Sequence, residues 1–277
     1  MGGWIASACQ AETTVLGISE GSQRNENLQA ALKQTDDRLR KQNVTAELIT
    51  KIGRTVPEIV KRTNETNYDL VVIGAERKRG GGLYTMSSRA YRIIEAIDPP
   101  VLVVIGEARE LHKILICSGG IHAEQAARFT GEIASRVKAA ITLLHIMNSP
   151  PVIYANLIQT REDSAESLLA SGTALGRNLS SQKQQIEELG VPCEVRLREG
   201  LVAEEIVKEA RHEDSDLIVA GSFPARDRLR RYVMGNVTRE IVDQADRSVL
   251  VVRTIEGSQG LGHRLGEWVA RTFGKSS

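Results

Sequence analysis

The chain has 277 residues, of which 41% are apolar, and this is enough apolar material for two domains of ordinary size. The 36 basic and 35 acidic side chains leave a net charge of +1, which excludes a general electrostatic attraction to nucleic acid or to an anionic membrane. No apolar run approaches the roughly 20 residues of a membrane span. We therefore expect neither nucleic acid nor a membrane as a partner.

The cysteine and aromatic contents narrow the class further. Cys9, Cys117 and Cys193 lie far apart and show no metal-ligand spacing, so the sequence predicts neither a disulfide framework nor a zinc site and favours a reducing, cytoplasmic setting. Because aromatic residues make up only 4% of the chain, the cores must be built from Val, Ile, Leu and Ala. That composition is typical of a buried parallel sheet covered by helices.

An internal repeat is the main organisational feature of the sequence. The first copy opens with "IASACQAETTVLGI" (5–18), and the same pattern returns as "IASRVKAAITLLHI" (133–146). Further on, "KIGRTVPEIVKRTNETNYDLVVIGAE" (51–76) matches "REGLVAEEIVKEARHEDSDLIVAGSF" (198–223) at a constant offset. The sequence therefore contains two copies of one structural unit.

The repeat sets the predicted domain boundaries. "DPPVLVVIG" and "DRSVLVVRT" end the two copies, which are joined by a short polar connector near "EARELH". We predict a first domain over 1–107, hereafter copy one, and a second over 112–254, hereafter copy two. Residues 255–277 follow as an amphipathic helical tail. Its apolar residues at helical spacing are Leu261, Leu265, Trp268, Val269 and Phe273.

Within copy two, predicted strands alternate with predicted helices. Short runs rich in β-branched residues alternate with longer segments in which apolar residues recur at helical spacing. Such an order produces parallel strands joined by crossover helices, and ligands are expected beyond the carboxyl ends of those strands. The five predicted strands are "HKILICSGG", "AITLLHIM", "PCEVRLREG", "SDLIVAGS" and "RSVLVVR".

These segments, in this order, resemble the universal stress protein family in a tandem form. The resemblance rests on "TLLHI", on the strand "DLIVAGS" and on "GNVTREIVDQADRSVLVVR", and it extends from about Ile5 to Thr254. It implies an α/β fold of two tandem, open, Rossmann-like parallel sheets, each of five strands in the order 3-2-1-4-5. It also implies that the chain is a homo-oligomer or an intramolecular pseudo-dimer.

Copy one lacks the segment that forms the first strand of copy two. It enters only near the end of the corresponding first helix, and in the family order the missing strand is the central one. We therefore predict either a fragment of a longer chain or a compacted domain of four strands, in which "TTVLGIS" (13–19) pairs directly with "DLVVIGA" (69–75). We also predict that the two copies pack through their fifth strands, "PVLVVIG" and "SVLVVR", because these apolar strands lie at a sheet edge.

The resemblance also implies a nucleotide motif, which is degenerate here. ATP-binding members carry a Gly, two residues, a Gly, nine residues, and then a Gly followed by Ser or Thr. Copy one keeps the spacing but loses two glycines, whereas copy two has Pro224 at the middle Gly, a loop longer by one residue and no hydroxyl. The Asp that such members place at the end of the first strand corresponds to Gly119. We therefore expect ATP binding to be weakened or lost.

If a nucleotide binds, we expect it in copy two, between the ends of "KILICSGG" and "SDLIVAGS". Glycines let the backbone wrap phosphates, and a helix N-terminus favours negative charge. Arginines of the intervening loop would supply charge, although solvated loop charges are the alternative interpretation. The predicted phosphate path comprises Gly119, Gly120, Gly221, Gly235 and Asn236, with Arg226 or Arg228 supplying charge.

Three functions remain open on the sequence. The first is a non-enzymatic stress-response module that acts through dimerisation and an unidentified protein partner. The second is a regulator that binds ATP or AMP in copy two. The third is a nucleotide hydrolase of the PP-loop pyrophosphatase type, suggested by "CSGG" but weakened by Ile121, His122 and Ala123, where that signature has other residues. His122 and His145 have no evident catalytic partner, and Cys117 is expected to be an inert core thiol.

Overall fold

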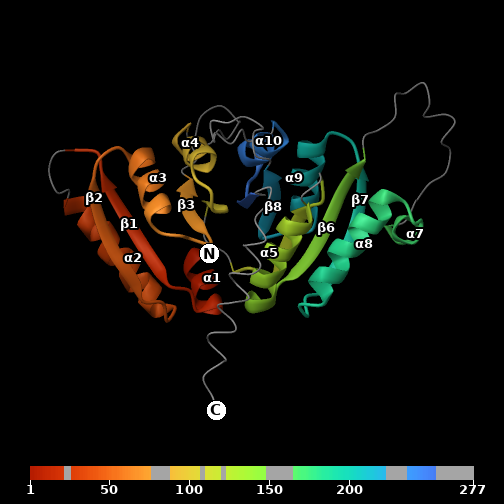
Figure 1. Cartoon of the computed structure of the whole chain (residues 1–277), viewed down its shortest axis with the longest axis horizontal. Coiled ribbons are helices and arrows are strands. Elements are labelled where there is room, and N and C mark those ends of the chain that lie inside the picture. The colour runs from red at the N-terminus through yellow and green to blue at the C-terminus, as the bar shows by residue number, and fades with distance from the viewer. Residues whose placement is uncertain are drawn as a thin grey trace, which may run out of the picture.

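The computed structural model describes residues 1–21, 26–75, 88–106, 110–119, 123–147, 165–222 and 236–253. Copy one and copy two lie side by side, with copy one on the left of Figure 1 and copy two on the right. The elements of copy one are α1 (Gly2–Cys9), β1 (Thr13–Ser19), α2 (Glu26–Lys41), β2 (Ala46–Ile52), α3 (Thr55–Glu65), β3 (Val71–Ala75), α4 (Ser88–Ala96) and β4 (Val101–Ile105).

Copy two follows the same order of elements but begins with an additional strand and a longer first helix. Its elements are β5 (Lys113–Cys117), α5 (Ala123–Val137), β6 (Ala140–Met147), α7 (Ala165–Ala170), α8 (Ala174–Glu187), β7 (Cys193–Glu199), α9 (Val202–His212), β8 (Leu217–Ser222), α10 (Asn236–Gln244) and β9 (Ser248–Arg253).

The sheet of copy two confirms the predicted α/β fold. Its strands lie in the order β7-β6-β5-β8-β9, which is 3-2-1-4-5 when they are numbered along the copy, and every pairing is parallel. The central strand β5 pairs with β6 on one edge and β8 on the other. Because helices cover both faces, Ile114, Leu115 and Ile116 in this strand are buried.

The two copies join through their fifth strands, as the sequence predicts. Strand β4 pairs with β9 in antiparallel register, with Leu102 opposite Leu250, so that β3 and β4 extend the five strands of copy two into one sheet of seven. Leu102 is fully buried in this arrangement, and neither fifth strand presents its apolar edge to water. The joint relates the two copies as an internal pseudo-dimer.

The core consists of two apolar layers, one on each face of the sheet. On one face, residues such as Ile116 and Val219 pack with α5 and α8, and α1 also packs on α5. On the other face, residues such as Leu115 and Val251 pack with α4, α9 and α10. Successive strand residues alternate between the two layers because side chains of a strand point to opposite faces in turn.

The repeat is preserved in detail between the two copies. Thr13 lies opposite Ala46 in copy one, and the equivalent residues Ile141 and Cys193 lie opposite each other in copy two. The turns before these strands also match, since Gln10 and Lys138 both adopt left-handed backbone conformations, with φ of 50° and 59°. The described strands of copy one therefore pair in the same register as their equivalents in copy two.

The predicted pairing of β1 with β3 is wrong. Strand β1 pairs with β2 in a separate two-stranded sheet, and β3 pairs only with β4 among the described residues. Helices connect the two sheets instead of a strand pairing. Helix α3 contacts both β1 and α4, and α1 packs on α5 of copy two. Gly2, at the start of α1, lies against Val72 of β3. A Cβ atom added to Gly2 would lie 3.2 Å from a methyl carbon of Val72.

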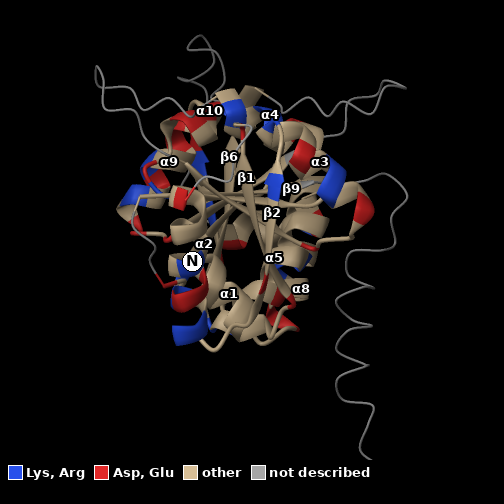
Figure 2. Ribbon diagram, turned by 90° about the vertical axis from the view of Figure 1, so that its left-hand side faces the viewer, with Lys and Arg blue, Asp and Glu red and all other residues tan. Residues whose placement is uncertain are grey.

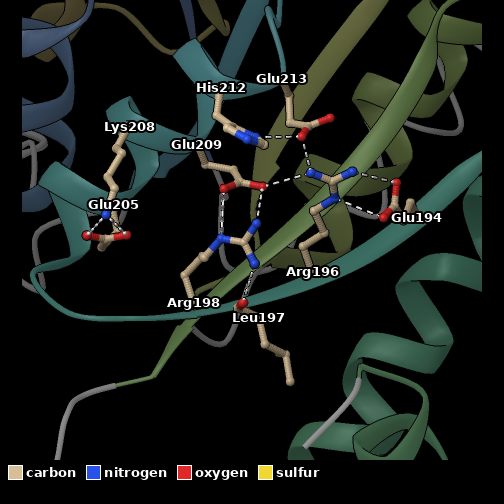
Figure 3. A network of polar contacts seen from close by, with 9 residues as sticks. All are labelled: Glu194, Arg196, Leu197, Arg198, Glu205, Lys208, Glu209, His212 and Glu213. Carbon is tan, nitrogen blue, oxygen red and sulfur yellow. Dashed lines mark hydrogen bonds and ion pairs between the residues drawn. The ribbon is translucent and has the colours of Figure 1, made fainter. Parts of the chain in front are cut away.

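An ionic cluster connects β7 with α9 (Figure 3). Arg196 and Arg198 lie two residues apart on β7 and therefore share one face of the strand, where both contact the carboxylate of Glu209. Glu209 is only 4% exposed, and the contacts from Arg198 Nε and Nη2 measure 2.8 and 3.0 Å. The cluster provides hydrogen-bond donors for the buried carboxylate of Glu209 and attaches α9 to β7 at the edge of the sheet.

Charges of both signs are interspersed along the described helices (Figure 2). No helix among the described residues is long and apolar enough to cross a membrane.

Candidate functional site

The carboxyl ends of β5 and β8 form the site that the sequence singles out. Ile116 of β5 lies opposite Val219 of β8, so the two strands end side by side. From these ends the chain continues to helices on opposite faces, α5 on one and α10 on the other. Such a point, where neighbouring strands lead to opposite faces, is where open α/β sheets bind ligands.

Three of the predicted site residues meet at this point. Gly119 follows β5 and is exposed, Gly221 lies near the end of β8 and is half-buried, and Asn236 begins α10. A Cβ atom on Gly119 or Gly221 would find open space, so neither glycine is required by close packing among the described residues. Gly120, Arg226, Arg228 and Gly235 lie outside the described residues.

Thr238 holds the start of α10 at the end of β8, a role that the sequence analysis did not identify. Its hydroxyl donates a hydrogen bond of 2.9 Å to the carbonyl of Gly221. The bond places the N-terminus of α10, with its partial positive charge, beside the strand ends. The motif has Ser or Thr directly after its last glycine. Here Asn236 holds that position and the hydroxyl residue comes two positions later, which is the signal that could have identified Thr238.

The turn after β5 is held by three further polar contacts. The backbone N–H of Ser118 donates to the carbonyl of Leu144 at 2.8 Å, and its hydroxyl donates to Oε1 of Gln182 at 3.3 Å. Nδ1 of His145 lies 2.7 Å from the carbonyl of Ser118, so this nitrogen carries the proton in that contact. His145 therefore has a structural role in this turn, and Ser118 and Gln182 are residues that sequence reasoning missed.

Gln182 anchors this network from the core. Its side chain lies on α8 and is completely buried. The side-chain nitrogen donates to the backbone carbonyl and to the side-chain oxygen of Asn178, one turn earlier. A buried amide must find such partners, because leaving it without hydrogen bonds costs about 1–3 kcal/mol. The network fixes the path of the chain directly before Gly119.

The described part of the site offers little acid–base or metal chemistry. Burial raises the pKa of the Cys117 thiol to about 12, so the thiol stays protonated at neutral pH, in keeping with the predicted inert core residue. No group of three or more His, Cys, Asp or Glu side chains suited to a metal ion occurs among the described residues. The position of the family's Asp is Gly119, which has no side chain to accept a ribose hydrogen bond.

Copy one does not repeat this arrangement. Gly74, near the end of β3, is the equivalent of Gly221, but β3 has no neighbouring strand in the position of β5 among the described residues. Arg77 and Ser87 of its degenerate motif lie outside the described residues, and Ser88 begins α4. Within the part of the chain that the structure describes, both strands of the candidate site occur in copy two alone.

The fold defines a tandem α/β protein, with a candidate ligand position at the switch point of its second sheet. The sequence profile of the universal stress protein family matches residues 8–104 and again 110–253. The chain therefore belongs to the universal stress protein family, with two family domains in one polypeptide.

Individual relatives agree with this assignment. A universal stress protein of Methanothermobacter thermautotrophicus is 25% identical over 143 residues, which are 52% of this chain and 96% of that protein. A second, from Methanocaldococcus jannaschii, is 29% identical over 142 residues, covering 51% of this chain and 81% of that protein. The crystal structure of a universal stress protein from Archaeoglobus fulgidus shares the fold, with a TM-score of 0.66 and 13% identity over 91% of this chain and 92% of that one.

Proposed function

We propose that this protein is a non-enzymatic stress-response regulator in which nucleotide binding is weakened or lost and which acts by binding a protein partner. The observation that carries the proposal is Gly119, which follows β5 where a carboxylate would be needed and leaves open space there. The three cysteines are free, which supports a reducing, cytoplasmic setting.

The internal joint of β4 and β9 supports the same proposal. The family resemblance implies a homo-oligomer or a pseudo-dimer, and here one chain already supplies both halves of a dimer-like assembly. Binding to a protein partner can then use the remaining surfaces without dissociation of the two copies. A homo-oligomer of the whole chain would be built on a different surface.

The second candidate is a regulator that binds AMP or ATP in copy two. The hydrogen bond from Thr238 to Gly221 favours it, because the N-terminus of α10 is thereby fixed beside the ends of β5 and β8. In this candidate, Asn236 and the two glycines would meet the phosphates and Arg226 or Arg228 would add charge. A PP-loop hydrolase is the least favoured alternative, since the described site holds no cluster for the metal ion that phosphate chemistry generally uses.

Thermal unfolding with and without ATP, AMP and Mg²⁺ separates the candidates. A ligand present at a hundred times its Kd stabilises a protein by about 2.7 kcal/mol. We expect no change in Tm for the first candidate, whereas a saturable increase with AMP or ATP would establish the second. Release of phosphate or pyrophosphate from ATP would instead support the hydrolase.

A further inference from the structure

In the sequence repeat, β1 and β3 of copy one are equivalent to β6 and β8 of copy two. The register of β1 with β2 repeats that of β6 with β7, and the register of β3 with β4 repeats that of β8 with β9. In copy two, β5 lies between β6 and β8 and pairs with both. No described strand occupies the corresponding place between β1 and β3, hereafter the strand gap.

Side chains beside the strand gap are exposed where their equivalents in copy two are buried. Val72 of β3 is 44% exposed, whereas the equivalent Val219 of β8 is 0% exposed. Val15 of β1 is half-buried, whereas its equivalent Leu143 is completely buried. Both strands also present one edge without a ladder among the described residues. Exposed apolar strands with unpaired edges are sites at which another strand adds.

Copy one retains an equivalent of the aspartate that anchors the start of β5 in copy two. In copy two, Oδ2 of Asp216 accepts hydrogen bonds from the backbone N–H groups of His112 and Lys113, at 2.8 and 3.0 Å, and so fixes the start of β5. The equivalent residue in copy one is Asp69, which is exposed. Its carboxylate makes no hydrogen bond or ion pair within the described part of the chain. Asp69 lies two residues before the first residue of β3, at the amino end of that strand.

Building on the proposed function, we propose that the strand gap binds one extended, apolar segment of a separate partner protein. The segment runs parallel to β1 and β3, and its first backbone N–H groups donate to the carboxylate of Asp69. Its central residues are aliphatic, as Ile114, Leu115 and Ile116 are in β5, because helices cover both faces of the position. Backbone pairing on two edges provides the affinity, and the two apolar layers select the side chains.

A synthetic peptide of residues 112–119, with Cys117→Ser, is the probe for this site. Hydrogen exchange followed by mass spectrometry on the full 277-residue protein should show rapid exchange in β1 and β3 without peptide and at least tenfold slower exchange with it. A peptide of the same composition in scrambled order should give no protection. Slow exchange of both strand edges in the free protein would show that the gap is already closed, and the proposal would be wrong.

Two pairs of protein variants test the location of the peptide. Asp69→Asn should weaken peptide binding about tenfold, because two hydrogen bonds to the peptide lose their charged acceptor. The control Asp37→Asn, the same change at an exposed residue of α2, should have no effect. Val72→Asp should abolish binding, whereas Val237→Asp, at a residue 41% exposed on α10, should leave it unchanged. Equal loss in a variant and its control would contradict the proposal.

A chimera provides the measurement if the peptide is poorly behaved. Because Gly2 is equivalent to Thr130, residues 112–129 placed directly before Gly2 would supply a strand, a turn and the first part of a helix in register. We expect Tm to rise by roughly 5 °C or more relative to the 277-residue chain. Asp69→Asn should lower Tm in the chimera and leave it unchanged in the parent. A chimera with an unchanged Tm would overturn the proposal.

Discussion

The phenol of Tyr91 in α4 donates a hydrogen bond to the carboxylate of Asp243 in α10, and so joins the two copies above the β4–β9 pairing. The guanidinium of Arg239 lies over the same ring, 5.0 Å from its centroid. Helices α4 and α10 lie next to each other in both overall views (Figures 1 and 2). This contact is the main described polar link between equivalent helices of the two copies.

Removing this hydroxyl should weaken the joint between the copies. Tyr91→Phe is expected to lower the free energy of unfolding by about 1–2 kcal/mol, because a hydrogen bond to a charged acceptor is lost while the ring is kept. Urea unfolding of Tyr91→Phe, Asp243→Asn and the double variant would measure the coupling. Strictly additive losses in the double variant would show that the pair does not interact in solution.

Tyr91 should also ionise only at unusually high pH. Burial, together with the hydrogen bond to Asp243 and its negative charge, raises the pKa of Tyr91 well above the ordinary value of 10.0. A raised pKa in the folded state means that the stabilisation is complete below pH of about 10 and is lost as the pH rises toward the folded value. An ultraviolet titration of the folded protein should therefore show a tyrosine that ionises well above pH 10, and the Tyr91→Phe variant should lack this signal.

The buried carboxylate of the β7–α9 cluster should be sensitive to substitution. Glu209→Ala removes the acceptor that Arg196 and Arg198 share, although Arg196 keeps its contacts with Glu194. We expect this change to lower the free energy of unfolding by about 3–5 kcal/mol. Lys208 also belongs to α9, but it pairs with Glu205 at the surface, so Lys208→Ala should cost less than about 0.5 kcal/mol (Figure 3). Chemical denaturation of the two variants provides the comparison, and similar losses would contradict a special role for burial.

The same cluster predicts a loss of stability in acid. The hydrogen bond from Arg196 holds the pKa of Glu213 below its ordinary value of 4.5, although the partial burial of Glu213 opposes the shift. A lowered pKa in the folded state gives stabilisation that is present above the unfolded pKa and is lost as the pH falls through the folded one. The difference in stability between wild type and Glu213→Gln should therefore be largest at neutral pH and shrink below about pH 4. A difference that stays constant with pH would refute this origin.

Restoring a carboxylate at the candidate site should restore nucleotide binding. The open space around Gly119 accommodates a side chain, so Gly119→Asp should fold as wild type does. If the missing carboxylate is what weakens nucleotide binding, Gly119→Asp should show a saturable increase in Tm with ATP and Mg²⁺, whereas Gly119→Ala should not. Equal responses of the two variants would indicate that the loop containing Pro224, rather than Gly119, limits binding.

The sequence by itself determined the family, the repeat and most of the fold. A constant offset between the copies indicated two equivalent units, and the alternation of "KILIC", "TLLHI" and "DLIVAG" with amphipathic segments predicted the parallel sheet of copy two. The apolar character of the two fifth strands, together with the edge position that the family resemblance implies for them, predicted their pairing. These features are local or follow from symmetry, so they can be inferred without knowledge of contacts between distant residues.

The tertiary structure alone decided where long-range contacts form. The sequence predicted that β1 would pair with β3, but β1 pairs with β2 and β3 pairs with β4. Which strands pair depends on how the whole layer of elements packs. Likewise, no spacing in the sequence places Ser118 beside Gln182, 64 residues away, or Tyr91 beside Asp243, 152 residues away. Single polar pairs of this kind carry no periodic signal, because their meeting depends on how the elements pack.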